Sequence, residues 1–464
     1  MTSPSSPERT EAVQSAVRDR RHRGVGDRDF DVVVFGCTGF VGKLVLEKMY
    51  RYAKPAGLRV AAAGRDEDKV KQVLELLDLE SKVGYIIAGI YDMDSVTAMV
   101  KNTRLVLNCV GPYALYGEPV VAACAEQGTD YMDLSGEVHF IEKMQLKYTE
   151  KARKSGAMIM SACAWDSVPE DLGFQLVRDK MVKQGMIPYS IDGFVDVLPG
   201  PFGYRANFGT YESAVLAMSS FKQFIKIRKA LRSKGLAPKL NRRGPSPVVP
   251  RKYLPVLFDS RVSGVYIPFL GTDPHVIKRS QQMLSLSDPE YIGVRSACYF
   301  KLPNGILPKL GYLFYGLLVF LFSLFEVGRK LLLNFPESFT HGMFSHRGPS
   351  KDQMDTTEYC DTASPNPLYK IDLFGRGYSD EKALEANPNK PDAEVRATVT
   401  GPDPGYNATS GIFTTLAMVL LTERESLGTK KGGVYTPAAV FRGSTAAKRL
   451  TEEGYAAFSA NLLE

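Results

Sequence analysis

Short apolar runs alternate with amphipathic segments between Asp31 and Ala162. Runs such as DVVVF and RLVLNCV are rich in branched apolar residues, which is typical of buried strands. Segments such as KLVLEKMY and DEDKVKQVLELL instead place apolar residues every three or four positions, as an amphipathic helix does. The strand segments lie at 31–35, 58–63, 84–89, 104–110, 131–135 and 157–162. Their alternation with helices predicts an α/β fold built on a doubly wound parallel sheet.

The pattern becomes less regular after about residue 186. We expect a strand at 189–198, one long helix at 209–235, and aperiodic loops at 235–252 and 346–367. A strand at 394–401 and a helix at 405–428 follow. A chain of 464 residues is also too long for one compact core, so we expect at least two domains.

The segment GCTGFVG, from Gly36 to Gly42, separates the first strand from the first helix. This is the position of the dinucleotide-binding fingerprint. In that motif Gly36 permits a tight turn, Gly39 lets a pyrophosphate approach the backbone, and Gly42 lets the helix pack closely on the strand. The N–H groups of the helix start would then face the phosphates. The alternative is a glycine-rich turn that binds no ligand.

The residue that follows the second strand is expected to select the cofactor. NAD enzymes usually carry Asp or Glu there, which binds the ribose hydroxyls. This chain has Gly64 followed by Arg65, and a guanidinium group suits a 2′-phosphate. We therefore expect NADP(H), with NAD(H) as the second choice. In the alternative, Arg65 only pairs with Glu67 or Asp68.

Two further loops are expected at the carboxyl edge of the sheet, near the nicotinamide end of a dinucleotide. In the first, NCVGPYALYG, backbone contacts are expected from Val110, Gly111 and Pro112, and Tyr113 could face the nicotinamide.

The second loop, SACAWDSVP, supplies Cys163 and Asp166, which with Tyr113 are the candidate catalytic residues. It also holds the single tryptophan, Trp165. Each residue of this loop has a structural alternative: Cys163 as a small buried apolar group, Trp165 as packing between domains, and Asp166 as a helix N-cap.

Other chemistries leave no signature in the sequence. The six cysteines occur singly, without a CxxC pair, and no HExxH occurs, so we expect no metal site. Residues 1–29 are rich in Ser, Pro and Arg without an apolar run, and we expect a disordered tail. The arginines of this tail leave import into an organelle as an alternative, against which its acidic residues argue.

The segment LGYLFYGLLVFLFSLF, residues 310–325, contains no charge. As a helix it would span about 24 Å, which is short of the roughly 30 Å core of a bilayer. We therefore expect it to lie on or dip into one leaflet, with burial in the second domain or in a dimer interface as the alternative.

Eleven basic residues and no acidic residue lie between Glu212 and Asp259, although the net charge of the chain is only +7. This basic stretch, 222–252, would favour anionic head groups, whereas the plain alternative is a solvated helix face and loop.

Six collinear segments together resemble the saccharopine dehydrogenase-like oxidoreductase family: GCTGFVGKLVL, AAGR, LNCVGPYALYGEPVVAACAEQGTDYMDLSGE, SACAWDSVPEDLG, NFGTYESA and GGVYTPAAVF. The resemblance extends from Asp31 to about Gly454 and is strongest to eukaryotic members, including the plant type. Bacterial trans-acting enoyl reductases of glycolipid synthesis are more distant relatives.

This resemblance implies a particular domain plan. The tail covers residues 1–29 and a Rossmann domain covers 30–185. A substrate and dimer domain with a mixed sheet follows at 186–400. The last segment, 401–464, returns to the Rossmann domain. In the family the cofactor loop positions correspond to Gly36, Thr38, Gly39, Phe40, Val41 and Arg65. The loop beside the nicotinamide corresponds to Gly111, Pro112 and Tyr113.

The expected function is an NADP(H)-dependent reductase of a lipid-like substrate on the cytoplasmic side of a membrane or lipid droplet, with the mitochondrion as the alternative location. A homodimer is expected, and a nucleic-acid partner is not. One alternative is a soluble imine or amino-acid reductase, whose carboxylate pocket would need arginines such as Arg205 and Arg376. The other is a lipid-surface protein that binds the cofactor without turnover.

Overall fold

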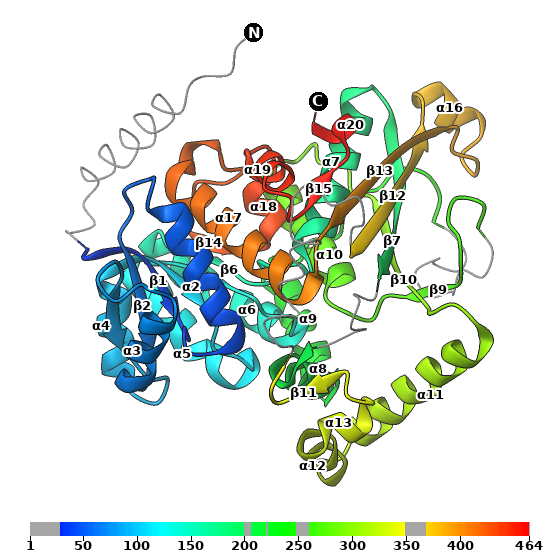
Figure 1. Ribbon diagram of the computed structural model, residues 1–464. Helices are drawn as coiled ribbons and strands as arrows, with labels where there is room; N and C mark the ends of the chain where they lie inside the picture. Colours follow the sequence, from blue (N-terminus) through cyan, green and yellow to red (C-terminus); the bar gives the residue numbers. More distant parts are fainter. Residues whose placement is uncertain (1–27, 199–205, 220, 247–258, 349–367, 464) are drawn as a thin grey trace.

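The computed structural model describes residues 28–198, 206–219, 221–246, 259–348 and 368–463. Two sheets form its body, with helices packed around and between them (Figure 1). One sheet is wholly parallel and the other is mixed. The prediction of an α/β fold with a doubly wound parallel sheet and a second mixed sheet is confirmed. The expected tail lies almost wholly outside the described residues.

The parallel sheet has the strand order β14-β6-β5-β4-β1-β2-β3. Its strands are β1 (Phe30–Phe35), β2 (Val60–Gly64), β3 (Gly84–Ile87), β4 (Thr103–Asn108), β5 (Asp130–Asp133), β6 (Met158–Met160) and β14 (Gly433–Tyr435). The order reverses direction at β1, which places a crevice at the carboxyl ends of β1 and β4. That edge is where the glycine loop and the two candidate catalytic loops meet.

Helices cover both faces of the parallel sheet, because its central strands β1, β2 and β4 are largely apolar and buried on both sides. The helices of this region are α2 (Phe40–Ala53), α3 (Glu67–Leu76), α4 (Met93–Lys101), α5 (Tyr113–Gln127), α6 (Val138–Ser155) and α17 (Thr409–Thr422). Their ends follow local chemistry: Asp66 and Asp92 cap α3 and α4, and left-handed Gly128 and Gly156 end α5 and α6.

The mixed sheet has the order β15-β13-β12-β7-β10-β9. Its strands are β7 (Ile187–Val197), β9 (Tyr266–Pro268), β10 (Arg295–Lys301), β12 (Tyr369–Tyr378), β13 (Ala393–Gly401) and β15 (Ala457–Phe458). Two helices, α7 (Val168–Lys183) and α10 (Asp273–Ser287), pack on it and on each other. One continuous apolar core joins residues of both sheets through α7.

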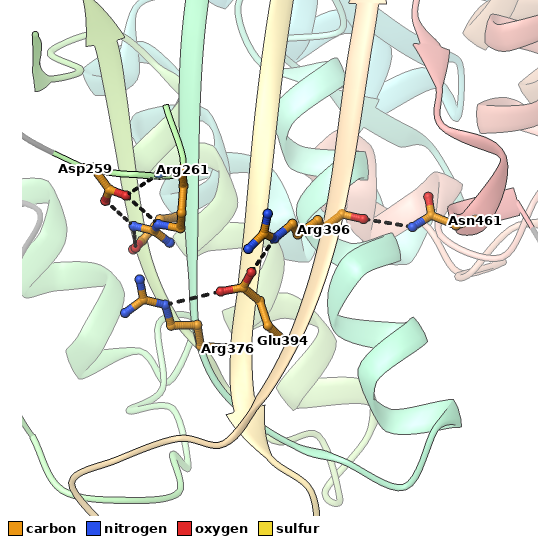
Figure 2. Close-up of polar contacts among 7 residues, drawn as sticks. Asp259, Arg261, Arg376, Glu394, Arg396 and Asn461 are labelled. Atoms are coloured by element: carbon orange, nitrogen blue, oxygen red, sulfur yellow. Dashed lines mark hydrogen bonds and ion pairs between the residues drawn. The ribbon is translucent and has the colours of Figure 1, made fainter. Parts of the chain in front are cut away.

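The face of the mixed sheet opposite α7, here called its second face, carries an aromatic cluster and ion pairs. Phe194 stacks on Tyr299 with ring centroids 5.1 Å apart. Arg261 packs over this cluster and pairs with Asp259 and Asp192, while Arg376 and Arg396 both point toward Glu394 (Figure 2).

The residues after 401 contribute to both sheets. Strand β14 lies beside β6, and α17 packs against α2 of the first domain, whereas β15 pairs with β13 of the mixed sheet. Short helices complete this part of the chain: the π-helical turn η3 (Pro404–Ala408), the 3-10 turn η4 (Arg424–Ser426), α18 (Pro437–Phe441), α19 (Ala446–Glu452) and α20 (Ala460–Leu463). A further short helix, α16 (Glu381–Ala386), connects β12 with β13. The boundaries at 185 and 400 stay predictions.

A helical lobe projects from the mixed-sheet side of the molecule (Figure 1). It contains β8 (Ala206–Asn207), α8 (Phe208–Ser219), α11 (Ile306–Ser323), α12 (Glu326–Asn334), α13 (Pro336–Phe339) and β11 (Phe344–Ser345). Tyr211, Val215, Val319 and Leu332 form its small core.

Two expectations about helices were wrong. The single helix expected at 209–235 is two helices, because α8 packs on α11 and α12 of the lobe whereas α9 (Phe221–Ser233) packs on α6. The apolar helix starts at Ile306 rather than Leu310, since Pro308 lies in its first turn, where proline is tolerated.

Candidate functional site

The glycine loop has the geometry that its sequence predicts. Gly36 has a φ of +87°, and the Gly39 N–H donates to the Gly36 oxygen at 3.0 Å, which closes a tight turn. A Cβ atom on Gly42 would lie 2.1 Å from that same oxygen. Only glycine therefore allows α2 to approach the loop this closely.

The start of α2 has no side-chain cap among the described residues. Gly39 is its N-cap, and the first turn contains no acidic residue. Thr38, Phe40 and Val41 line this turn, and Phe40 lies edge-on to Tyr406 with ring centroids 4.9 Å apart. Free N–H groups and the positive end of the helix dipole fit a pyrophosphate here.

Arg65 directly follows β2 and is exposed. The nearby acids have other partners: Lys69 pairs with Asp66 at 3.2 Å, and Lys71 pairs with Glu67 at 2.7 Å. Among the described residues Arg65 has no ion pair, so its guanidinium group is available for a 2′-phosphate. The alternative in which Arg65 pairs with Glu67 or Asp68 is not observed.

The loop after β4 is fixed by Asn108. Its Oδ1 atom accepts from the Val110 N–H at 3.0 Å, and its Nδ2 donates to the Tyr131 hydroxyl at 3.0 Å. Val110, Gly111 and Pro112 follow at the sheet edge, where their backbone lies beside the glycine loop: a Cβ on Gly36 would lie 2.8 Å from the Val110 side chain.

Tyr113 does not present its hydroxyl at this edge. The hydroxyl donates to the Asn108 oxygen at 2.9 Å, and the side chain is buried against Phe140. Burial raises the pKa of Tyr113 well above its usual value. Glu137 caps the helix that Tyr113 begins, because its carboxylate accepts from the N–H groups of Tyr113 and Ala114 at 2.8 Å. These contacts give Tyr113 a structural role and argue against a role in proton transfer.

Cys163 is fully buried in the apolar core, and burial raises the pKa of its thiol well above the usual value. A neutral buried thiol is a poor nucleophile, so the structural alternative fits this residue. Trp165 packs edge-on against Tyr369 of β12 at 5.6 Å and so contributes to the packing between the two sheets.

Asp166 is partly buried and lies beyond β6 at the carboxyl edge. Its Oδ2 atom lies 2.8 Å from the Thr272 hydroxyl. Burial raises the pKa of Asp166 to about 6, and a hydrogen bond donated by Thr272 would oppose that rise. Of the three candidate catalytic residues, Asp166 alone combines partial exposure with a carboxyl group that can carry a proton near neutral pH.

Sequence reasoning missed Asp133, which ends β5. Its carboxylate joins two loops of the site, since it accepts from the Ser135 N–H and the Ser161 hydroxyl, each at 2.9 Å, and from the Ala162 N–H at 3.2 Å. Burial raises the pKa of Asp133 to about 6. An acidic residue at the end of a buried strand, in the segment YMDLS, was the available signal.

A group of buried acids also lies at the junction of the sheets, on α7 and α10. Glu170, Asp171 and Asp273 are buried, and burial raises the pKa of each. Within the described residues no group of three or more His, Cys, Asp or Glu side chains could hold a metal ion.

Comparison with known proteins agrees with this geometry. Residues 32–160 match the family model of the saccharopine dehydrogenase NADP binding domain. The human "Saccharopine dehydrogenase-like oxidoreductase" is 36% identical over 441 residues, which are 92% of this chain and 96% of the human one. The "Lipid droplet localized protein" of Caenorhabditis elegans is 34% identical over 89% of this chain and 94% of its own. A Mycobacterium tuberculosis protein, named as a candidate trans-acting enoyl reductase, is 28% identical over 92% of this chain and 96% of its own.

The fold recurs in a solved structure, the apo saccharopine dehydrogenase (L-Glu forming) of Saccharomyces cerevisiae. The two chains superpose with a TM-score of 0.51 over 93% of this chain and 99% of the yeast one. Their sequence identity is 12%, so this likeness shows the fold alone. With the glycine loop, the free helix start and Arg65, the matches show that the chain belongs to the saccharopine dehydrogenase-like oxidoreductase family and is an NADP(H)-binding oxidoreductase.

Proposed function

We propose that this oxidoreductase reduces a lipid-like, unsaturated substrate at the surface of a membrane or lipid droplet. The observation that carries the proposal is the exposed apolar surface of α11 and α12 on the same chain as the dinucleotide site. The names of the C. elegans and M. tuberculosis relatives support a link to lipids. The mitochondrion stays the alternative location, because the arginine-rich residues that favour it lie outside the described part of the chain.

The apolar helix is exposed rather than buried. Its 18 residues have a mean hydropathy of 1.7, and only 11% of them are buried. Apart from Met218 on α8, the large exposed apolar residues described in the lobe run along one continuous segment of chain: Ile306, Leu307, Leu310, Tyr312, Leu313, Phe314, Leu317, Phe320, Leu321, Leu324, Phe325, Val327, Leu331 and Phe335. We call this set the apolar face. A contiguous apolar surface of this kind is typical of a contact with lipid or protein.

By length and composition alone α11 could cross a membrane. It is about 27 Å long at 1.5 Å per residue. We favour contact with one leaflet, because Lys309 lies in its first turn and Arg329 follows in α12. Basic side chains beside an apolar face favour anionic head groups. A lipid surface is therefore the occupant that we assign to the apolar face.

The basic stretch offers fewer free cations for anionic head groups than its charge suggests. Arg228 forms a bidentate pair with buried Glu142 and packs over Phe224, so it stabilises the contact of α9 with α6. Arg243 pairs with Glu381. Exposed cations remain on α9 and the following loop, at Lys226, Lys229, Arg232, Lys234 and Lys239. Residues 247–252 lie outside the described residues.

The residues of the site would have different roles in the proposed reaction. The glycine loop and the start of α2 would hold the pyrophosphate, Arg65 the 2′-phosphate, and the loop at Val110 to Pro112 the nicotinamide end. The bound dinucleotide supplies the hydride. Asp166 is the candidate source of the proton that must accompany it, since it is a partly buried residue whose carboxyl group lies at the same edge of the sheet.

Two alternatives keep specific tests. A soluble imine or amino-acid reductase would need arginines that bind the carboxylates of its substrate. Arg376 already pairs with Glu394 on the second face of the mixed sheet (Figure 2), and Arg205 lies outside the described residues. A cofactor-binding protein without turnover would bind NADPH and lipid but consume no NADPH with any enal or imine.

A homodimer also stays a proposal, to be tested by light scattering.

The test of the lipid surface exchanges Phe314 and Leu317 for glutamate together. These side chains are 69% and 55% exposed, so the fold should be kept. Binding to vesicles of phosphatidylcholine and phosphatidylserine should fall at least about 100-fold, because two buried apolar contacts of about 1.5–3 kcal/mol each are lost. Flotation of the purified chain with vesicles measures this.

The matched control makes the same exchange at Leu76 and Leu270, which are exposed but lie outside the lobe. Equal vesicle binding by the lobe variant and the wild type would contradict the lipid contact. In parallel, titration with NADPH and NADH tests the oxidoreductase itself. Absence of binding by either nucleotide would contradict the proposed reaction whatever the vesicles show.

A further inference from the structure

Thr272 and Asp166 meet at the junction of the two sheets, although 106 residues separate them in the chain. Asp166 follows β6 of the parallel sheet, and Thr272 directly precedes α10, which packs against β10 of the mixed sheet. The Thr272 Oγ1 atom lies 2.8 Å from Asp166 Oδ2 and 2.9 Å from the backbone oxygen of Gly136. The residue that precedes α10 thus contacts the candidate proton donor, which follows β6 of the parallel sheet.

The two contacts of Thr272 constrain the proton on Asp166. A threonine hydroxyl has one proton to donate, and the Gly136 carbonyl oxygen can only accept. If Asp166 were ionised, its carboxylate would also only accept, and one of the two short oxygen–oxygen contacts would have no proton. If Asp166 is neutral, it donates to Thr272, and Thr272 donates to Gly136. Both contacts are then hydrogen bonds.

The surroundings also disfavour an ionised Asp166. A Cβ on Gly136 would lie 2.7 Å from Asp166 Oδ2, so glycine is needed for this close approach. Burial is the largest effect on the pKa of Asp166 and disfavours its charged form. The carboxyl groups nearby are Glu170 on α7 and Asp273 on α10, and a charged Asp166 would raise the pKa of each.

We propose that Thr272 is a positioning residue that holds Asp166 in its neutral, proton-donating form at the carboxyl edge of the parallel sheet. The proposal rests on the proposed reductase function and assigns the direction of its proton. Reduction of a carbon–carbon or carbon–nitrogen double bond adds one hydride, with its two electrons, and one proton. Asp166 gives that proton, becomes a carboxylate, and regains a proton from the solvent before the next turnover.

The test follows the protonation of Asp166 directly, with infrared difference spectra of the full-length chain between pH 5 and pH 8. The carbonyl band of the neutral acid is assigned by its loss in Asp166→Asn. We expect a midpoint well above that of an ordinary carboxyl group in the wild type, because burial disfavours the charged form, and the same midpoint in Thr272→Ser, which keeps the hydroxyl. In Thr272→Val the neutral form loses its acceptor, and the midpoint should fall by about one pH unit.

Three results would overturn the proposal. A rise of the midpoint in Thr272→Val would show that Thr272 donates to an ionised Asp166. The others are an unchanged midpoint in that variant, and an Asp166 that is already ionised at pH 5 in the wild type. An Asp166 that is ionised at pH 5 in the wild type overturns the proposal even if Thr272→Val does not fold. NADPH titration of the same preparations separates the two claims. Loss of NADPH binding contradicts the reductase, whereas an ionised Asp166 in a chain that binds NADPH contradicts only the role of Thr272.

Discussion

Exchange of Arg65 for aspartate is expected to weaken NADPH binding about 100-fold and to leave NADH binding almost unchanged. The structure leaves the Arg65 guanidinium exposed beyond β2, while Lys69 and Lys71 pair with the neighbouring acids. A charge-assisted contact to the 2′-phosphate would be lost and replaced by repulsion, and 100-fold corresponds to about 2.7 kcal/mol. The ribose of NADH carries no such phosphate, so its affinity should change little. Fluorescence titration with both nucleotides measures the difference.

The control for Arg65 is Lys82→Asp, which makes the same change of charge in the same domain. Lys82 pairs with Asp78 after α3, in the loop before β3. A similar loss of NADPH affinity in both variants would assign the effect to the general field of the domain and contradict a direct contact. A blocked site, Gly39→Trp, gives the baseline without nucleotide, because a large side chain there would fill the approach to the start of α2.

The second large effect is expected from Asp171→Asn, which should raise the free energy of unfolding at pH 8 by about 2 kcal/mol. Asp171 is fully buried, and burial raises its pKa to about 7 from an ordinary value of 3.8. A raised carboxyl pKa gives stability that is fully present below about pH 4 and is lost as the pH rises to about 7 and beyond. Three units correspond to about 4 kcal/mol, from which the unpaired amide of asparagine subtracts about 2 kcal/mol.

Urea unfolding at pH 5 and pH 8 checks this sign. The wild type should lose more stability than Asp171→Asn between the two values, because asparagine does not ionise. The Asp171 side chain accepts from Ser280 and from the Ala438 N–H, and the asparagine oxygen can keep both contacts. Asp68→Asn, at an exposed position of α3, is the matched control and should leave the pH dependence unchanged. If the free energies of unfolding of Asp171→Asn and the wild type change equally with pH, ionisation of Asp171 does not destabilise the fold and the prediction is wrong.

The part of the candidate site that would hold the cofactor could be predicted from the sequence, because its determinants are local. The turn at Gly36, the helix start at Phe40 and the cation at Arg65 all lie within one strand–helix–strand unit. Their spacing therefore sets their geometry. The catalytic half was not accessible in this way. Tyr113 and Cys163 were reasonable candidates by position, but the direction and burial of a side chain depend on neighbours that are remote in sequence. Asp133 and Thr272 acquire their contacts only when strands and helices from several parts of the chain meet.

The amino-acid sequence by itself determined the parallel sheet, the nucleotide loop, the preference for NADP(H) and the presence of an apolar helix, because each follows from local periodicity, glycine spacing or charge. It could not decide whether that helix is buried, since a segment that is apolar on all sides has no polar face to orient it. The tertiary structure decided this. Helix α11 packs through Val319 and Ser323 on a small core and leaves most of its apolar surface exposed. It also placed Thr272 on Asp166, because close packing of α7, α10 and the two sheets brings together groups that no local pattern connects.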